Sequence, residues 1–141
     1  MNKHEEFRYL IGCMDGRLIH AVGRYCGDDY VDTCCDAGLV GRLVDMSSEN
    51  RPELIERIKR QMKVSVEVHK SQVVYVAGHA ECAGHPVSDH QHKLDIIHAT
   101  AIVQDLATSA GYTLEIVPIW CERDTDGVWQ AHILPTNQAD L

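Results

Sequence analysis

The sequence lacks any apolar run that is long enough to cross a membrane, so we expect no membrane-spanning helix. Its first residues, Met1 to Glu6, are polar and partly acidic, which argues against a secretory signal peptide. Basic side chains are also scarce, since 13 Lys and Arg stand against 21 Asp and Glu, and they are scattered along the chain. The net charge of -8 argues against a nucleic-acid partner. We therefore expect a soluble, cytoplasmic protein that binds neither membranes nor nucleic acid.

Linkers, internal repeats and low-complexity segments are absent as well. A chain of 141 residues, 45% of them hydrophobic, can bury one core, so we expect a single domain over residues 1–141. Without a secretory segment, the cysteines are expected to be free thiols or metal ligands. Cys34 and Cys35 are adjacent in an apolar run and should point to opposite faces of a strand. We expect these two, with Cys26 and Cys121, to be small buried hydrophobic residues.

Strand and helix patterns alternate along the chain. Apolar runs predict strands at 7–13, 30–35, 72–78, 112–121 and 128–134. Apolar residues at helical spacing predict helices at 17–26, from 48–52 to about 68, and from 88–89 to about 110. In the last helix, we expect the buried stripe to consist of Leu94, Ile97, Ala101 and residues 103–106. Residues 37–41 are expected to form a loop, and 124–127 a hairpin turn. This order predicts a mostly parallel α/β sheet with flanking helices and an antiparallel edge strand.

Three potential zinc ligands follow two of the predicted strands. Cys13 comes at the end of the first strand, and His79 and Cys82 come just after the strand at 72–78. Two thiolates and one imidazole are the ligand set of a catalytic zinc site, which keeps a fourth position for water or a carboxylate. The alternative is two buried cysteines and an incidental histidine. We favour ligation because three ligand types fall at two strand ends. These strands must then be neighbours, which predicts the strand order 2-1-3-4.

Asp15 and Arg17 follow directly after Cys13. A carboxylate beside zinc can be a fourth ligand, or it can accept a hydrogen bond from the metal-bound water. A nearby arginine favours the second role, because a bidentate pair holds the carboxylate away from the metal. The alternative is an aspartate that caps a helix beside a solvated arginine.

Together, Cys13-x-Asp15-x-Arg17 and His79-x-x-Cys82 resemble the metal signature of the β-class carbonic anhydrases. The resemblance covers roughly residues 7–134, and the predicted strand order matches the sheet of that family. It implies one Zn²⁺ held by Cys13, His79 and Cys82, with Asp15 and Arg17 as catalytic residues. It also implies reversible hydration of carbon dioxide to bicarbonate by a zinc-bound hydroxide. By the same analogy we expect a homodimer or higher oligomer that pairs through the second strand or the hairpin edge.

The sequence also departs from the family pattern, which suggests a small, divergent member. The family usually has an Arg-Asn pair before the Ala-Gly of the loop after strand two, and here Cys35 and Asp36 stand there. The chain also starts almost at the first strand, so we expect the N-terminal helical arm of the family to be absent. The other histidines are expected to be mostly solvated on the surface, with His85 or His90 as a candidate proton shuttle.

Three other functions fit the same residues. Hydrolysis of carbonyl sulfide or carbon disulfide would use the same zinc site with a different substrate cleft. A zinc-binding regulatory or interaction protein would keep the ligands without catalysis, but it would not need Asp15 and Arg17. A thiol enzyme would use Cys13 or Cys82 as nucleophile and His79 as base. This last function leaves one thiol and the Asp-Arg pair without a role.

Overall fold

The computed structural model describes residues 6–141. Residues 1–5, which carry most of the polar start that argues against a signal peptide, lie outside this range. Within residues 6–141 the strands are β1 (Phe7–Gly12), β2 (Tyr30–Cys35), β3 (Val73–His79), β4 (Glu115–Arg123) and β5 (Trp129–Ile133). The helices are α1 (Gly16–Cys26), α2 (Leu39–Val44), α3 (Arg51–Lys63) and α4 (Asp89–Ser109). A π-helical turn (Val64–Val68) continues α3, and a 3₁₀ turn (Gln138–Asp140) lies near the C-terminus. No helix in the described part of the chain combines the length and the apolar character that a membrane crossing needs.

The strands form one sheet in the order β2-β1-β3-β4-β5. β1 runs parallel to both β2 and β3, β3 runs parallel to β4, and β5 pairs with β4 in the antiparallel direction. The predicted strand order and the antiparallel edge strand are therefore confirmed. The chain leaves β1 for a strand on one side and later returns to a strand on the other side. The carboxyl ends of β1 and β3 thus meet at a topological switch point, where open α/β sheets form their binding crevices.

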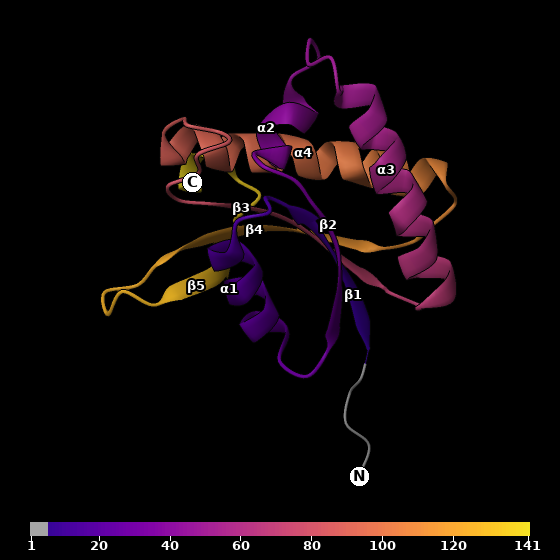
Figure 1. Ribbon diagram of the computed structural model, residues 1–141, viewed down its shortest axis with the longest axis horizontal. Helices are drawn as coiled ribbons and strands as arrows, with labels where there is room; N and C mark the ends of the chain where they lie inside the picture. The colour runs from indigo at the N-terminus through magenta and orange to yellow at the C-terminus, as the bar shows by residue number, and fades with distance from the viewer. Residues whose placement is uncertain (1–5) are drawn as a thin grey trace.

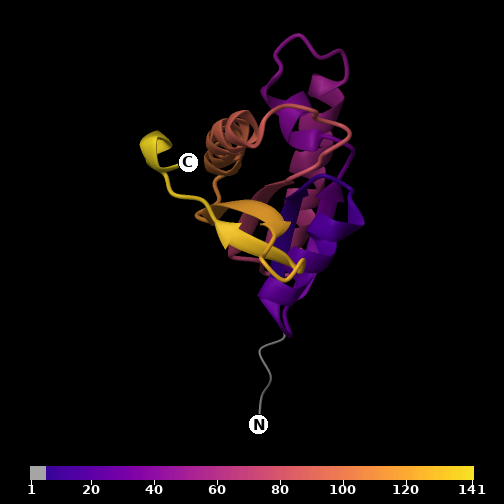
Figure 2. The same cartoon turned by 90° about the vertical axis from the view of Figure 1, so that its left-hand side faces the viewer.

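Helices cover both faces of the sheet (Figures 1 and 2). Helix α1 packs on the face that carries Leu10, whereas α2, α3 and α4 pack on the face that carries Tyr9 and Ile11. This division follows from the two-residue period of a strand, which sends neighbouring side chains to opposite faces. Cys34 packs in the cluster under α3 and α4, and Cys35 contacts the cluster under α1, as their adjacency predicts. Cys35 is only partly buried, unlike Cys34.

The expected loop over residues 37–41 is wrong, because helix α2 begins at Leu39. Leu39, Val40 and Leu43 are all buried and pack against α3 and α4. Gly41 would disfavour a helix by its intrinsic propensity, but its missing side chain leaves the space that the ring of His85 fills. Packing against a distant segment therefore stabilises a helix that local sequence does not favour.

The helix that continues to Val68 is confirmed, although its last turn has π geometry. Val64, Val66 and Val68 alternate as in a strand, yet Val64 and Val68 remain 49% and 68% exposed. Ser65 is fully buried, and its hydroxyl lies 2.7 Å from the hydroxyl of Ser71. The wider turn places this serine, rather than a valine, against the next segment of the chain.

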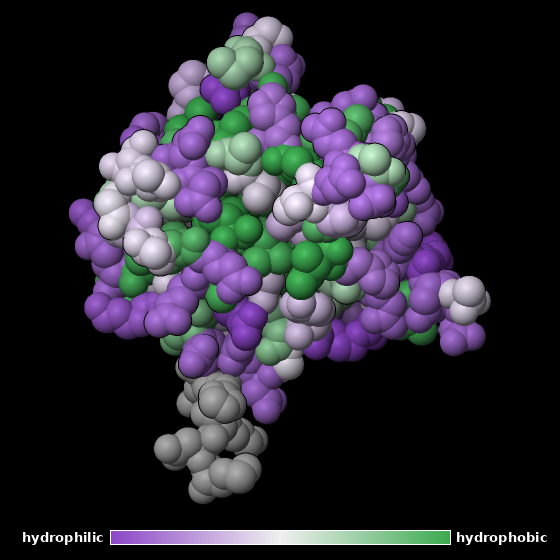
Figure 3. Space-filling model, turned by 180° about the vertical axis from the view of Figure 1, so that it is seen from behind, coloured by the Kyte–Doolittle hydropathy of each residue, from purple (hydrophilic) through white to green (hydrophobic). Residues whose placement is uncertain are grey.

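The predicted buried stripe of α4 is wrong in register. The residues that face the core are His92, Ile96, Ala99, Val103 and Ala107. Of these, only Val103 belonged to the predicted stripe. Leu94 and Ile97 are half-buried and Ala101 is exposed. Seen from behind, apolar side chains gather in the middle of the surface, over α4 and β4 (Figure 3). Helix α4 thus has apolar residues on two sides, which is why helical spacing did not identify the buried one.

Candidate metal centre

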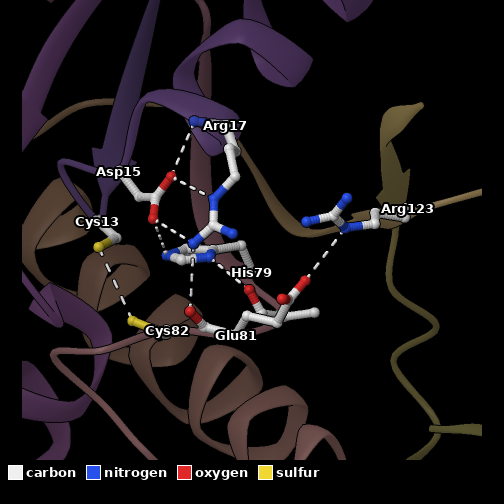
Figure 4. A network of polar contacts seen from close by, with 8 residues as sticks. Cys13, Asp15, Arg17, His79, Glu81, Cys82 and Arg123 are labelled. Atoms are coloured by element: carbon white, nitrogen blue, oxygen red, sulfur yellow. Dashed lines mark hydrogen bonds and ion pairs between the residues drawn. The ribbon is translucent and has the colours of Figure 1, made fainter. Parts of the chain in front are cut away.

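Three side chains that can bind a metal meet at the switch point between β1 and β3. Cys13 follows the last residue of β1, His79 is the last residue of β3, and Cys82 lies in the turn that follows. All three are buried, and one ligand atom from each lies within 4.8 Å of the others. The sulfur atoms of Cys13 and Cys82 are 3.9 Å apart (Figure 4). Two thiolates bound at 2.3 Å to one tetrahedral zinc ion would be separated by about 3.8 Å, so this spacing fits such an ion.

The orientation of His79 also fits a metal. Its Nδ1–H donates a hydrogen bond of 2.7 Å to the carbonyl oxygen of Ala80. This assigns the free lone pair to Nε2, which is buried and has no hydrogen-bond partner among the described residues. A buried acceptor without a partner is destabilising unless a ligand uses it. Metal-binding histidines typically have this arrangement, in which the second nitrogen donates to a carbonyl group.

The two thiols differ in how readily they ionise. Burial opposes ionisation of Cys13, but the nearby His79 ring and the backbone N–H groups of Gly38 and Asp15 lower the pKa of its thiol to about 7. Burial, together with the proximity of Cys13, raises the pKa of the Cys82 thiol. The Cys13 thiol is therefore about half ionised at neutral pH, whereas the Cys82 thiol ionises when a cation binds.

Asp15 both caps helix α1 and pairs with Arg17. Its side chain accepts a hydrogen bond from the backbone N–H of Arg17 and so caps helix α1. The guanidinium of Arg17 also donates to both carboxylate oxygens, at 3.0 Å from Nε and 2.8 Å from the terminal nitrogen. This pairing lowers the pKa of Asp15 to about 2. The remaining side of the carboxylate faces the ligands, because its Oδ2 lies 3.9 Å from Nε2 of His79.

Arg17 also joins the two halves of the site. Besides Asp15, it contacts the backbone carbonyl of Glu81 at 3.3 Å (Figure 4). Glu81 lies between the two ligands of the second motif and has a left-handed backbone with φ of 60°. Such a conformation is costly for a residue with a side chain. It closes a turn tight enough that His79 and Cys82 reach the same point.

A family model described as "Putative carbonic anhydrase" matches residues 3–133 of this chain. The chain belongs to this carbonic anhydrase family. No curated protein matches the sequence.

Solved carbonic anhydrases share the fold. The enzyme of Streptococcus mutans matches with a TM-score of 0.57 and 18% identity, over 91% of this chain and 81% of that one. The β-carbonic anhydrase CafD of Aspergillus fumigatus gives a TM-score of 0.56 at 11% identity, over 94% and 91% of the two chains. CafA of the same fungus gives 0.55 at 14% identity, over 94% and 77%. The predicted β-class resemblance and its sheet are confirmed.

The loops that follow β2 and β3 touch each other through two glycines, Gly38 and Gly84. Gly38 has a left-handed backbone with φ of 60°, and a Cβ added to it would overlap the carbonyl group of Gly84. A Cβ added to Gly84 would lie only 2.6 Å from the backbone nitrogen of Gly38. The backbone of the Ala37-Gly38 loop therefore lies directly against the turn that carries Cys82.

Asp36 stands where the carbonic anhydrase family usually has asparagine, and its carboxylate pairs with two arginines. Its carboxylate pairs with Arg42 of α2 at 2.5 Å and with Arg57 of α3 at 2.9 Å. Its backbone N–H donates to the carbonyl of Gly12. Asp36 thus ties α2 and α3 to the end of β1, the strand that Cys13 follows.

The expectation of solvated histidines is wrong for His92. Its ring is 3% exposed and packs edge-on against Trp120 at 5.3 Å and against His85 at 4.9 Å. Burial, together with the nearby His85 and His79, lowers the pKa of His92 to about 4, so the ring is neutral near pH 7. The two shuttle candidates differ, because His90 is exposed whereas His85 is mostly enclosed and its Nε2 lies 2.7 Å from Asp95.

The β4–β5 hairpin supplies residues that sequence reasoning did not connect with the site. Trp129 of β5 lies beside Arg17 and His79, and Arg123 of β4 pairs with Glu81 at 3.3 Å. The predicted strand at 128–134 contained the relevant signal, since its alternation puts Trp129 and Ala131 on one face. That signal does not say which distant residue the face contacts.

Proposed function

We propose that this protein catalyses the reversible hydration of carbon dioxide to bicarbonate with one bound zinc ion. The observation that carries the proposal is the joint placement of the Cys13, His79 and Cys82 ligand atoms with the Asp15–Arg17 pair. A simple storage site needs the ligands but not the pair. Membership of the carbonic anhydrase family supports the same reaction.

In this proposal, Cys13, His79 and Cys82 hold the zinc ion. Their two thiolates would balance its charge, and the Lewis acidity of the ion would make a water molecule acidic enough to supply hydroxide near neutral pH. With three protein ligands, such an ion would keep one position open for that water. Nδ1 of His79 stays fixed on the carbonyl of Ala80, so that the ring keeps Nε2 turned to the site.

Asp15 orients the attacking water. Both carboxylate oxygens accept hydrogen bonds from Arg17, and the low pKa of Asp15 keeps it ionised at every pH at which the enzyme would work. An ionised carboxylate can accept a hydrogen bond from the water but cannot donate one. Asp15 therefore aligns the oxygen lone pair toward the carbon of carbon dioxide, while Arg17 holds the carboxylate in place.

Stopped-flow hydration of carbon dioxide tests the proposal. We expect protein with one zinc per chain to exceed the buffer rate, and to lose that excess after chelation. Cys82→Ser should lose both zinc and activity. Zinc-loaded protein with no rate above buffer between pH 6.5 and 9 would contradict the proposal. Parallel assays with carbonyl sulfide would then separate a different substrate from a purely zinc-binding role.

We also propose a homodimer. β2 is an edge strand of the sheet, so the backbone groups on its outer side have no strand partner among the described residues and can pair with a second copy. The apolar surface over α4 and β4 is a second candidate face (Figure 3). Sedimentation equilibrium should give twice the chain mass, and a monomer at micromolar concentration would contradict this. The single domain over residues 1–141 and the cytoplasmic location stay predictions.

A further inference from the structure

Trp129 occupies a position beside the metal centre that the proposed reaction does not explain. The guanidinium carbon of Arg17 lies over its indole ring, 4.9 Å from the ring centroid. The guanidinium of Arg123 lies over the same ring at 5.3 Å. The indole and the His79 ring also form a T-shaped pair, with ring centroids 6.4 Å apart and planes inclined by 68°. One aromatic side chain thus contacts Arg17 and a candidate metal ligand at once.

Several contacts hold Trp129 in this position. Arg24, two turns after Arg17 on α1, donates a hydrogen bond to the backbone carbonyl of Trp129. Across the hairpin, Trp129 is in register with Arg123, and Arg123 pairs with Glu81 in the turn between the ligands. Helix α1 therefore holds the backbone of Trp129, and Arg123, which is itself paired with the turn between the ligands, lies over the indole ring. A ring held in this way can limit how its neighbours move.

Arg17 needs such a restraint. Its side chain is 37% exposed, and a pair with that much access to water is weak and leaves the long arginine side chain free to change rotamer. A flat aromatic face attracts a guanidinium group and fixes the plane of its fork. If the side chain of Arg17 swung away, the Asp15 carboxylate would lose its guanidinium partner, and only the backbone N–H of Arg17 would still donate to its Oδ1. Its Oδ2 is already 3.9 Å from Nε2 of His79, so it would be free to move onto the metal ligands' common centre.

We propose that Trp129 is a positioning residue that keeps Arg17 on Asp15, and thereby keeps the Asp15 carboxylate out of the fourth ligand position. Its kinetic consequence rests on the proposed carbonic anhydrase function, whereas the positioning itself does not. The aromatic ring, and not merely apolar bulk, is the feature that acts. Phenylalanine should therefore replace Trp129 well, and leucine should not.

Hydrogen exchange of the Arg17 Nε–H group tests the positioning without any assay of activity. This group donates to Oδ1 of Asp15 at 3.0 Å, so it should exchange slowly in the zinc-loaded, ¹⁵N-labelled protein. Arg17→Lys assigns its signal by removing it. We expect exchange about tenfold faster in Trp129→Leu and nearly unchanged in Trp129→Phe, a ratio consistent with the loss of one cation–π contact. Unchanged exchange in Trp129→Leu would overturn the proposal. Trp129→Met replaces the leucine variant if the latter does not fold.

Kinetics provide the second test. We expect Trp129→Leu to keep one zinc per chain and to lose about tenfold in kcat/KM, with Trp129→Phe close to the parent protein. Trp129→Leu added to Arg17→Lys should cost nothing more, because the ring acts through Arg17. Ile133→Ala is the control, since Ile133 is exposed on the same strand and face, and it should keep full activity. Multiplying losses in the double variant would overturn the proposal. Absence of activity in the parent protein would refute the proposed function, and the exchange measurement would still decide the role of Trp129.

Discussion

Replacing Gly38 with alanine tests whether the loop after β2 must lie directly against the turn that carries Cys82, which is called the ligand turn below. Gly38 combines a φ of 60° with a backbone contact to Gly84 that leaves no room for a Cβ. Its N–H group also supports the ionised thiol of Cys13. The substitution therefore changes three things at one position: the backbone energy, the packing of two loops, and the environment of a ligand.

A control variant separates the cost of the left-handed backbone from the cost of the clash. Gly111 also has a positive φ, of 83°, but a Cβ there would meet nothing within 4 Å. We expect Gly111→Ala to lower the free energy of unfolding by about 1–2 kcal/mol, which is the cost of a left-handed residue with a side chain. At Gly38 the clash adds a further cost of about 1–3 kcal/mol, since the obstructing atoms belong to the backbone and cannot rotate away.

Urea unfolding of both variants, with and without zinc, measures these free energies. Gly38→Ala should be less stable than Gly111→Ala by at least about 1 kcal/mol, and the gap should widen with zinc because the ligand turn is displaced. Zinc affinity should also fall in Gly38→Ala and stay unchanged in Gly111→Ala. Equal unfolding free energies for the two variants would show that the contact between the loops does not matter, and the reasoning would be refuted.

Asp15→Asn should retain zinc and lose at least about a hundredfold in kcat, because an amide cannot act as an ionised acceptor; full activity would remove Asp15 from the mechanism. Zinc affinity should rise with pH, since the metal displaces protons from the thiols. Competition titrations should show a steeper rise below about pH 7, where Cys13 is also protonated, and a uniform slope across that pH would contradict the pKa of its thiol. Asp36→Ala should leave Arg42 and Arg57 without their carboxylate partner and lower the melting temperature by several degrees. An unchanged melting temperature would show that these two ion pairs do not stabilise the fold.

The sequence predicted the parts of the site that depend on local pattern. Cys13, His79 and Cys82 could be recognised because ligand types follow directly after apolar strands, and parallel strands end at the same edge of a sheet. The adjacency of Asp15 and Arg17 to Cys13 was equally local, and their bidentate pairing is present in the structure. The strand order followed from the need to bring Cys13 to His79.

The parts that were missed depend on contacts between distant segments. Helix α2 exists because Leu39, Val40 and Leu43 find a surface formed by α3 and α4. The buried side of α4 could not be chosen from spacing, since both of its sides carry apolar residues. The burial of His92 is likewise decided by Trp120 and by the space that Gly78 leaves beside its ring.

Sequence alone thus determined which residues form the candidate metal site and which strands they follow, because a strand's period and a ligand's chemistry are local properties. Tertiary structure alone decided what surrounds them. Trp129 meets Arg17 only because an antiparallel hairpin packs beside α1, and Asp36 is paired with Arg42 and Arg57 only because two helices place these arginines beside it. Such contacts depend on how whole elements pack together, which no short stretch of sequence specifies.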